Sequence, residues 1–529
     1  MTTKKPNILL IIVDHMAFAG HYGNDRYPYI WPNLEKLAKQ GAWFERAYTA
    51  APICTPARAS IMTGQRPSRH GLRWNSEYSI LQNLKDFRGG QRLYAHSTAA
   101  QGYRNAYVGK WHCGLNRLPI DYGIEGWGLP EYGNLYGSEK YKSYLAEIGE
   151  NQPFCRIEHN LSLPDDCGTT VLMDPPNAWK YMEGCGVLEG PASLHEQFFL
   201  AHTAEQSLRA LAQQDQPFCL VASFWGPHQP YYPSEEFAAL VKPEDIPVYP
   251  SFDENLQEKP LRYSAHRDLK GDSQANVKWP SWDIWQTVLA RCYAQGLQTD
   301  AAVGQLLGVL DELNLAEDTL VILTADHGDT IASHGGVWDK HSTFPEELAR
   351  IPLVLRWPNH IEAGKRVDKL VTSMDVTGTA LSAAGADIDD IDGRNLVPLC
   401  QSEENTSWPD HLICEHYGHS GDILHQRIAY KDHWKYVAVY GADDELYNLN
   451  NDPYELVNLV KNTDYQHICS KLRALIIDEL RKEREIRAKQ HPPSELEYML
   501  VDSTPQWPRE EKMLLYKLEQ MMTADSNTI

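Results

Sequence analysis

The chain has 529 residues, of which 42% are hydrophobic, so it is long enough to bury a substantial core. Its 49 Lys and Arg against 71 Asp and Glu give a formal net charge of −22. This acidic balance excludes proteins that bind nucleic acid or anionic lipid through a basic face.

Signals for a membrane span, a secretory leader and disulfides are all missing from the sequence. The longest obvious apolar run covers residues 8–13, far short of the ~20 residues of a membrane-spanning helix. No secretory signal precedes it, so we expect a cytoplasmic protein, or a periplasmic one if a leader has been removed. The ten Cys show no close pairing and predict no disulfide framework.

Apolar runs typical of buried strands alternate with helical patterns along the first two thirds of the chain. Strands are predicted over residues 6–13, 105–108, 218–224, 319–325 and 350–357, and helices over 32–40 and 284–315. This alternation predicts an α/β fold with a large, mostly parallel central sheet flanked by helices.

Four of the predicted strands end next to ionisable residues. In parallel sheets of this kind, ligands bind beyond the carboxyl ends of the strands, so these residues predict one common site. They are Asp14 and His15, Lys110 and His112, His228, and Asp326 and His327.

The texture of the chain changes near residue 384. Strand-like pieces at 427–440 and a charged helix at 469–489 predict a smaller C-terminal α+β subdomain. We expect a catalytic domain over 1–385, this subdomain over 386–490 and an extension over 491–529. The extension carries a helical piece near 510–521, and its apolar stripe predicts docking on the chain's own core or on a neighbouring subunit of a homo-oligomer. The stripe consists of Leu514, Leu515, Leu518 and Met522.

Residues 54–64 predict a helix that begins at a cysteine. Pro56 suits the first helical turn and Gly64 the helix end, which places Cys54 at the helix N-terminus. Backbone amides and the helix dipole there favour an anion and lower the pKa of a thiol. On this segment alone, a half-buried Cys beside a turn is an equally good interpretation.

The segment Cys54-Thr55-Pro56-Ala57-Arg58 resembles the C-x-P-x-R signature of the formylglycine-dependent sulfatases of the alkaline-phosphatase superfamily, in which the Cys is oxidised to formylglycine. Other segments resemble landmarks of the same family, in the same order, from about residue 6 to 460. The resemblance implies an alkaline-phosphatase-like fold and a sulfuric ester hydrolase. These segments are Asp14-His15, Gly109-Lys110-Trp111-His112, Pro227-His228-Gln229-Pro230, and residues 324–328, 338–353, 392–394 and 445–453.

The resemblance further implies a metal centre. Asp14 and Asp326 would supply hard oxygen ligands, and His15 and His327 would complete the site with the formylglycine made from Cys54. Many relatives carry Asp, Gln or Asn in place of the two His. Ca²⁺ is the expectation for the family, although imidazole also suits Mn²⁺ or Zn²⁺.

Roles for the other motif residues follow from the same resemblance. Lys110 and Lys340 would bind the sulfate oxygens, where charge develops in the transition state, and Arg58 would hold the nucleophile in place. His112 would take the proton that triggers sulfate release, and His228 would protonate the leaving oxygen.

Four further residues have two interpretations each. Asn75 could bind a sulfate oxygen or a sugar hydroxyl, although a turn is the ordinary role of Asn, and His341 beside Lys340 is either a substrate ligand or structural. His334 is interpreted as closing a turn. Cys113 is interpreted as a packed thiol, because it has no C-x-x-C partner for a metal.

The predicted substrate is a sulfate ester on a carbohydrate. A net charge of −22 confines any positive field to the pocket, which favours a mono- or oligosaccharide or a chain end over a long polyanion. Aromatic segments at 27–31, 231–232 and 279–285 suit sugar rings or ordinary packing, and residues 115–191 are expected to shape specificity. The expected partners are this small substrate and a formylglycine-generating enzyme, with no nucleic acid and no membrane.

Three alternative functions stay open. A phosphonate monoester or phosphodiester hydrolase of the same superfamily also resembles this chain, although the Gly109–His112 segment favours a sulfatase. A binding module that lost activity is disfavoured by the intact Cys54, Lys110 and His228. A plain cysteine hydrolase would need no conversion of Cys54.

Overall fold

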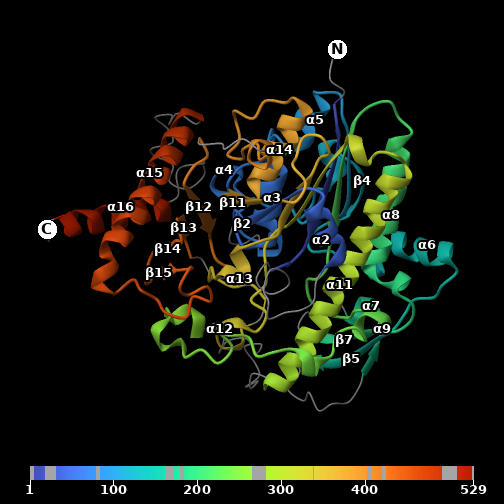
Figure 1. The fold of residues 1–529 in the computed structure, drawn as a ribbon, viewed down its shortest axis with the longest axis horizontal. Helices are drawn as coiled ribbons and strands as arrows, with labels where there is room; N and C mark the ends of the chain where they lie inside the picture. Colours follow the sequence, from blue (N-terminus) through green and yellow to red (C-terminus); the bar gives the residue numbers. More distant parts are fainter. Residues whose placement is uncertain are drawn as a thin grey trace.

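The structure is a computed structural model. It describes residues 5–17, 31–78, 84–160, 171–178, 184–264, 281–337, 339–401, 407–419, 424–490 and 509–526. Figure 1 shows a large sheet flanked by helices and a smaller C-terminal sheet beside it. Within the described residues, no helix is long and apolar enough to cross a membrane.

The central sheet has eight strands in the order β11-β2-β10-β9-β1-β8-β3-β4. All pairs are parallel except those made by β10, which runs antiparallel to both of its neighbours. The predicted mostly parallel α/β fold is therefore confirmed. The strands are β1 (Asn7–Val13), β2 (Ala42–Tyr48), β3 (Arg104–Lys110), β4 (Glu125–Leu129), β8 (Phe218–Phe224), β9 (Thr319–Ala325), β10 (Leu353–Arg356) and β11 (Lys365–Thr372).

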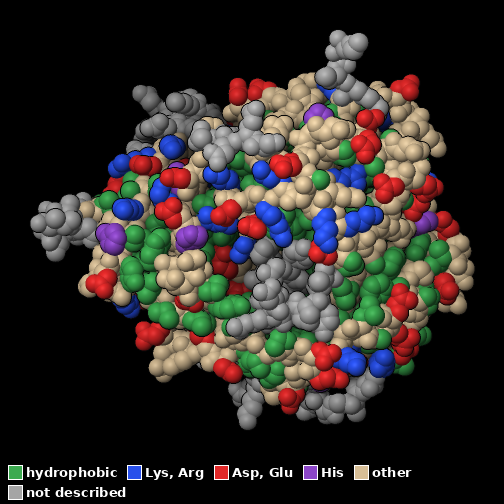
Figure 2. All heavy atoms as spheres, viewed as in Figure 1, with side chains coloured by type: hydrophobic (Ala, Val, Ile, Leu, Met, Phe, Trp, Pro, Cys, Tyr) green, Lys and Arg blue, Asp and Glu red, His purple; other side chains and the backbone are tan. Residues whose placement is uncertain are grey.

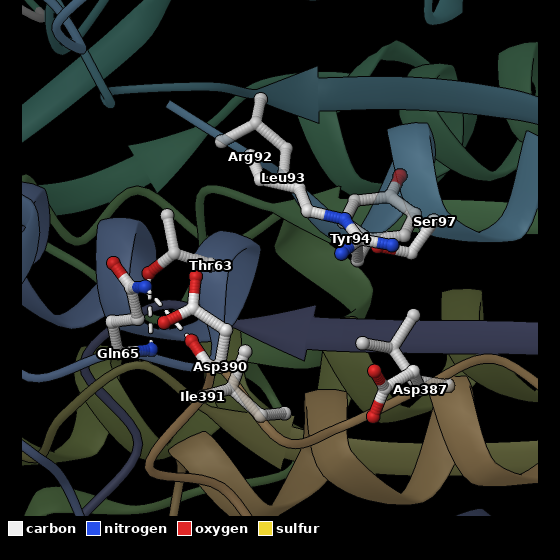
Figure 3. A pocket seen from close by; sticks show the side chains of 10 residues that line it. Thr63, Gln65, Arg92, Leu93, Tyr94, Ser97, Asp387, Asp390 and Ile391 are labelled. Atoms are coloured by element: carbon white, nitrogen blue, oxygen red, sulfur yellow. Dashed lines mark hydrogen bonds between the residues drawn. The ribbon is translucent and has the colours of Figure 1, made fainter. Parts of the chain in front are cut away.

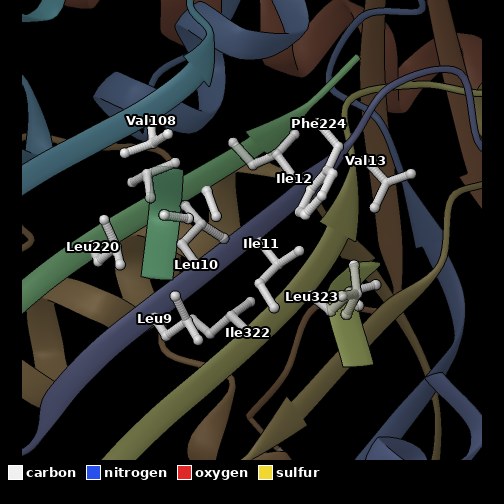
Figure 4. Packing of buried hydrophobic residues seen from close by; sticks show 14 of the residues in the cluster. Leu9, Leu10, Ile11, Ile12, Val13, Val108, Leu220, Phe224, Ile322 and Leu323 are labelled. Atoms are coloured by element: carbon white, nitrogen blue, oxygen red, sulfur yellow. The ribbon is translucent and has the colours of Figure 1, made fainter. Parts of the chain in front are cut away.

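The core of the molecule is built around β1. All seven of its residues are buried, because β8 and β9 pair with it on either side and helices cover the faces of the sheet. Leu10 lies opposite Val221 of β8 and Ile322 of β9, and Figure 4 shows the side chains of these strands interlocking. Each Leu or Ile buried in this way contributes roughly 1.5–3 kcal/mol.

Helices flank the sheet in two groups (Figure 1). The long α11 (Trp282–Glu312) packs against α8 (Glu196–Ala212) and α2 (Pro32–Lys39). In the other group, α14 (Met374–Ala384) packs against α3 (Cys54–Thr63) and α5 (Tyr94–Ala99). The shorter α-helices are α4 (Pro67–His70), α6 (Glu139–Ile148), α7 (Pro175–Ala178), α9 (Glu235–Ala238), α12 (Ser333–Gly336) and α13 (Glu346–Ala349).

A three-stranded antiparallel sheet lies within the segment predicted to shape specificity. Its order is β6-β5-β7, with β5 (Cys155–Asn160), β6 (Val171–Met173) and β7 (Gly184–Leu188). Bridges from β7 to Tyr231 and Ser234 attach it to the chain that follows β8.

The C-terminal sheet is antiparallel and has the order β12-β13-β14-β15. Its strands are β12 (His411–His416), β13 (Gln426–Lys431), β14 (Trp434–Val439) and β15 (Glu445–Asn448), and α15 (Gln466–Gln490) packs on them. The predicted limits of the three domains stay predictions.

The tail helix α16 (Arg509–Ser526) packs on its own chain. Leu514 and Leu518 of the predicted stripe are fully buried against α15 and the C-terminal sheet, and Met522 packs at the edge. The Lys517 ammonium lies 2.6 Å from the Asp444 carboxylate, which ties the helix to the turn before β15. Of the two surfaces on which the extension was expected to dock, the structure shows it on the chain's own core. The Leu515 side chain lies outside the described residues, and a homo-oligomer stays a prediction.

Candidate active site

Cys54 is the first residue of α3, as the sequence predicts. The helix ends at Gly64, whose φ of 68° is a left-handed conformation that favours Gly. The backbone N–H of Thr55 in the first turn donates to Asn75 Oδ1 at 3.1 Å. Cys54 is fully buried, so the alternative of a half-buried Cys beside a turn is wrong.

Strand ends of the central sheet converge on the Cys54 thiol. Its Sγ lies 3.2 Å from His327 Nε2, 3.6 Å from Lys110 Nζ and 4.0 Å from Asp14 Oδ1. Asp14 follows β1, Lys110 ends β3 and His327 follows β9, so three strands deliver these groups. The Lys110 ammonium also donates to the Asp14 carboxylate.

Arg58 contacts both carboxylates of the site. Its Nε donates to Asp326 Oδ2 at 2.8 Å, and its NH2 lies 3.6 Å from Asp14 Oδ1. All three side chains are fully buried. Burial and the Asp326 charge raise the pKa of Asp14. Burial also acts to raise the pKa of Asp326, but Arg58 and His327 outweigh it and lower that pKa. We call Asp14, Cys54, Arg58, Lys110 and Asp326 the nucleophile cluster.

Four of the five predicted metal ligands offer ligand atoms within 4.8 Å of one another, namely Asp14, His15, Cys54 and His327. The fifth, Asp326, lies beside them, but its Oδ1 accepts from the N–H groups of His15 at 3.3 Å and His327 at 2.9 Å, and its Oδ2 from Arg58. A buried carboxylate with two imidazoles fits a divalent cation. The raised pKa of Asp14 means that burial and Asp326 disfavour its ionised form, which a bound cation would stabilise.

Lys340 joins the metal-ligand candidates to the predicted acid. Its Nζ lies 2.6 Å from His15 Nε2, 3.1 Å from His228 Nε2 and 3.1 Å from Asp339 Oδ1. Burial, followed by nearby cationic groups, lowers the pKa of both His15 and His228, so both rings are neutral and accept from the ammonium. Burial acts against the charge of Lys340, but Asp339, Cys54 and Asp14 together outweigh it and raise the Lys340 pKa.

Three groups of the site escaped the sequence analysis. Glu77 Oε1 lies 2.8 Å from His112 Nε2, and the Tyr132 hydroxyl lies 3.0 Å from His228 Nδ1, with Lys110 Nζ 4.1 Å from the centre of the Tyr132 ring. Asp329 Oδ2 lies 3.3 Å from His15 Nδ1. Of the three, only Asp329 has a signal, because it follows the family-like segment 324–328 by one residue.

The two predicted substrate ligands occupy different settings. Asn75 is buried and its Oδ1 accepts the Thr55 N–H, so it caps the first turn of α3. His341 is buried beside Lys340, and its carbonyl accepts a hydrogen bond from His416. It also lines a small cavity together with Tyr263, Thr330, His334, Val337 and Thr343.

The aromatic segments suggested as sugar-binding walls mostly pack in the interior. Trp31, Trp285 and Tyr231 belong to the hydrophobic core, and Tyr231 donates to Asp329 at 2.8 Å. Of the two interpretations, ordinary packing therefore holds for these residues. Residues 27–30 and 279–280 lie outside the described residues.

Cys113 is a packed thiol, as expected. It is fully buried, and burial raises its pKa.

His334 does more than close a turn. Its φ of 49° is left-handed, and its ring lies 2.7 Å from Glu254 and 3.5 Å from Glu347. Glu347 and Glu455 also offer ligand atoms near it, so this trio has metal-like spacing.

Lysines fill the surroundings of this trio. The Lys259 ammonium donates to the Glu455 carbonyl, and Lys435 Nζ lies 2.7 Å from Glu455 Oε1 and 3.3 Å from Glu346 Oε1. These charges make the cluster a buried ion-pair network rather than a cation site. We call Lys259, His334, Glu346, Glu347, Lys435 and Glu455 the Lys435 network.

A surface pocket at the far end of α3 contains none of the predicted site residues (Figure 3). Thr63 and Gln65 line it from the end of the helix, and Arg92, Asp387 and Asp390 line it from neighbouring segments. On the face shown in Figure 2, basic side chains are interspersed with acidic ones.

Comparisons with known proteins agree with this architecture. The model of the Sulfatase family matches residues 6–386, and that of the "N-sulphoglucosamine sulphohydrolase, C-terminal" family matches residues 333–483. An arylsulfatase of Clostridium perfringens is 28% identical over 510 residues, covering 91% of this chain and 95% of the relative. An N-acetylglucosamine-6-O-sulfatase of Bacteroides thetaiotaomicron is 24% identical, covering 94% of this chain and 89% of the relative.

Two solved structures share the fold. The phosphonate monoester hydrolase of Agrobacterium radiobacter superposes with a TM-score of 0.71 at 21% identity, covering 91% of this chain and 96% of that one. A protein solved in complex with its substrate D-glucosamine-2-N,6-O-disulfate superposes with a TM-score of 0.68 at 19% identity, covering 91% of this chain and 99% of that one.

The match of the Sulfatase family model to residues 6–386 places this fold, with its buried charged site at the strand ends, in the alkaline-phosphatase superfamily. The chain belongs to the sulfatase family, and it is a sulfuric ester hydrolase, as its motifs predict.

Proposed function

We propose that the protein hydrolyses a sulfate monoester on a carbohydrate, at a mono- or oligosaccharide or a chain end. The nucleophile is a formylglycine made from Cys54, and Asp14, His15, Asp326 and His327 hold a divalent cation, Ca²⁺ by expectation. The observation that carries the proposal is the convergence of His327, Lys110 and Asp14 within 3.2–4.0 Å of Cys54 Sγ.

Formylglycine, the cation and side chains of this chain each supply part of the chemistry. Formylglycine and the cation supply an activated oxygen nucleophile and neutralise sulfate charge. Lys110 and Lys340 are buried ammonium groups that face the thiol and the two imidazoles, so they are placed to bind sulfate oxygens. Arg58 lowers the pKa of Asp326 and lies 3.6 Å from Asp14, so it positions both carboxylates beside the nucleophile.

His228 is the proton donor to the leaving oxygen in this proposal. Its ring is neutral without substrate, because burial and the Lys340 ammonium lower its pKa. An anionic sulfate bound beside Lys340 would offset that ammonium and raise the His228 pKa. The Tyr132 hydroxyl at His228 Nδ1 fixes the ring, so Nε2 is the atom that faces Lys340 and the substrate.

Carbohydrate specificity is supported by the N-acetylglucosamine-6-O-sulfatase relative and by the acidic surface, which disfavours long polyanions. The alternative is hydrolysis of phosphonate monoesters or phosphodiesters, which the structural likeness to a phosphonate monoester hydrolase favours only at the level of fold.

The test compares four substrate classes on enzyme whose Cys54 conversion has been checked by peptide mass spectrometry. Free sulfate and phosphate are measured from sulfated oligosaccharides, an aryl sulfate, a phosphonate monoester and a phosphodiester. We expect sulfate release from a sugar to be faster than from the aryl ester. Turnover of the phosphorus esters alone would overturn the proposal in favour of the alternative. Full activity of enzyme that retains the Cys54 thiol would indicate a plain cysteine hydrolase.

A further inference from the structure

His112 is held by one ring nitrogen and open at the other. His112 follows β3 in a left-handed backbone conformation with a φ of 47°, and it is only 1% exposed. Its Nε2 lies 2.8 Å from Glu77 Oε1. Its Nδ1 is buried and has no hydrogen-bond partner among the residues that the structure describes.

The Glu77 carboxylate decides which nitrogen carries the proton of the neutral ring. Burial acts to raise the pKa of Glu77, but the charge of His112 and its hydrogen bond outweigh burial and lower that pKa to about 2. An ionised carboxylate only accepts hydrogen bonds, so Nε2 must be the donor. The same pairing raises the His112 pKa, so the ring is neutral only above that raised value, and its lone pair then lies on Nδ1.

The open nitrogen belongs to the nucleophile side of the site. Burial lowers the pKa of His112, but Glu77 and then the Cys54 thiol outweigh burial and raise it. His112 follows Lys110 by two residues, Lys110 Nζ lies 3.6 Å from Cys54 Sγ, and the Tyr132 ring that Lys110 faces at 4.1 Å has its centre 6.1 Å from that of the His112 ring. Because Glu77 already occupies Nε2, Nδ1 is the nitrogen left for a proton from the nucleophile.

Glu77 is itself tied to the helix that carries the nucleophile. It lies in a short 3-10 helix over Ser76–Tyr78. Just before it, Asn75 Oδ1 accepts the Thr55 N–H at 3.1 Å, and the Ser76 N–H donates to Thr55 Oγ1 at 3.3 Å. These bonds fix the start of this segment relative to the residue that follows Cys54.

We propose that Glu77 is a positioning residue, which fixes His112 as the Nε2–H tautomer and thereby presents Nδ1 to the nucleophile as the proton acceptor. The inference rests on the proposed function, because it assigns the atom through which His112 acts there. The competing interpretation is an ordinary Glu–His ion pair that only stabilises the loop.

The first test reads the tautomer directly, in protein that retains the Cys54 thiol. Nitrogen NMR of histidine-labelled protein, with the His112 signals identified by their loss in His112→Gln, reports which ring nitrogen carries hydrogen. At a pH above the raised His112 pKa, where the ring is neutral, we expect the Nε2–H form alone in the native chain. In Glu77→Gln we expect a mixture, because an amide can donate as well as accept.

The matched control is Glu147→Gln, which alters a Glu–His pair outside the site, with His202 Nε2 3.3 Å from Glu147 Oε1. It should leave the His112 signals unchanged. A pure Nε2–H form of His112 in a folded Glu77→Gln variant would overturn the proposal.

The second test uses converted enzyme and the sulfate ester found in the substrate panel. We expect Glu77→Gln to lower kcat roughly 10²-fold, at the low end of what general acid–base catalysis contributes, with KM little changed. Glu77→Asp should recover part of the loss. The double variant with His112→Gln should be no slower than His112→Gln alone, since both changes remove one function.

The proposal would be overturned if the kcat of the double variant fell by the product of the two single losses. It would also be overturned if Glu77→Gln kept the native kcat. A native enzyme that releases no sulfate from any ester would instead refute the proposed function. The tautomer measurement would still decide the role of Glu77.

Discussion

The nucleophile cluster and the Lys435 network bury the same kinds of charge for different ends. In the network, Lys435 Nζ contacts Glu455 at 2.7 Å, Glu346 at 3.3 Å and the Phe344 carbonyl at 2.5 Å. An ammonium has three protons, so this lysine is satisfied within the chain. No ligand can replace any of these partners without breaking the fold.

The lysines of the site have partners that can exchange. Lys340 contacts two neutral imidazole nitrogens besides Asp339, and Lys110 lies 3.6 Å from the Cys54 thiol besides its bond to Asp14. An incoming anion offers such a lysine a stronger acceptor than an imidazole or a thiol. Burial alone therefore does not separate a stabilising cluster from a reactive one; the identity of the partners does.

The comparison predicts its largest effect at the nucleophile itself. Cys54→Ala removes the only group of its cluster that can be converted to the nucleophile, so we expect turnover to vanish. Sulfate release and thermal unfolding should be measured together. The fold should persist, because the charges of Asp14, Arg58 and Asp326 stay paired. Residual turnover at the native rate would contradict the assignment.

In the Lys435 network, the corresponding loss is one of stability. Lys435→Met leaves Glu346 and Glu455 buried without their cation, which should cost about 3–5 kcal/mol of unfolding free energy. Denaturant titration measures this loss, and activity per folded molecule should be unchanged. The matched control is Lys142→Met, whose pair with Glu139 is exposed, and it should change stability by less than about 1 kcal/mol.

At Lys340 we expect the opposite result, namely a large loss of activity and a smaller loss of stability. Lys340→Met removes a donor placed for the sulfate, and we expect kcat to fall roughly 10²–10³-fold. Stability should fall less than in Lys435→Met, since two of the Lys340 partners are neutral imidazoles. A larger stability loss than in Lys435→Met would erase the distinction between the lysines of the active site and Lys435.

The smallest effect concerns the pH dependence of the Lys435 network. Burial and Lys259 lower the pKa of His334, but Glu347 and Glu254 outweigh them and raise it. A raised pKa in the folded state stabilises the protein below the unfolded value of about 6.5 and loses this effect as pH rises through the folded value. The difference in stability between the native chain and His334→Asn should therefore be larger at pH 6 than at pH 9. Equal differences would show that folding does not raise the His334 pKa.

The sequence predicted the parts of the molecule that local pattern determines. Uniform apolar runs identified β1, β8 and β9, and the motif residues Asp14, Cys54, Lys110 and His327 meet as expected. The strands β2 and β11 escaped, because their charged residues interrupt the apolar run. The antiparallel direction of β10 also lies outside local pattern, since it depends on which strands it pairs with.

Partners brought together by the fold were out of reach. Glu77 and Tyr132 belong to no motif, and they join the site only because their loops lie over the strand ends. The Lys435 network unites residues that are more than 100 positions apart in the chain, such as Glu346 and Glu455. The sequence could not decide whether the aromatic segments bind sugar or pack in the core, because a Trp or Tyr shows the same sequence pattern in both settings.

Arg58 connects the nucleophile helix to three strands at once. Its guanidinium donates to the Lys110 carbonyl at the end of β3, to Ser223 Oγ on β8 and to Asp326 after β9. The first turn of α3 therefore cannot detach without breaking its hydrogen bonds to the carboxyl ends of these three strands, which carry the other residues of the site. Amide hydrogens in this turn should exchange with solvent only through global unfolding. We therefore expect no local unfolding of the reactive centre that leaves the central sheet folded.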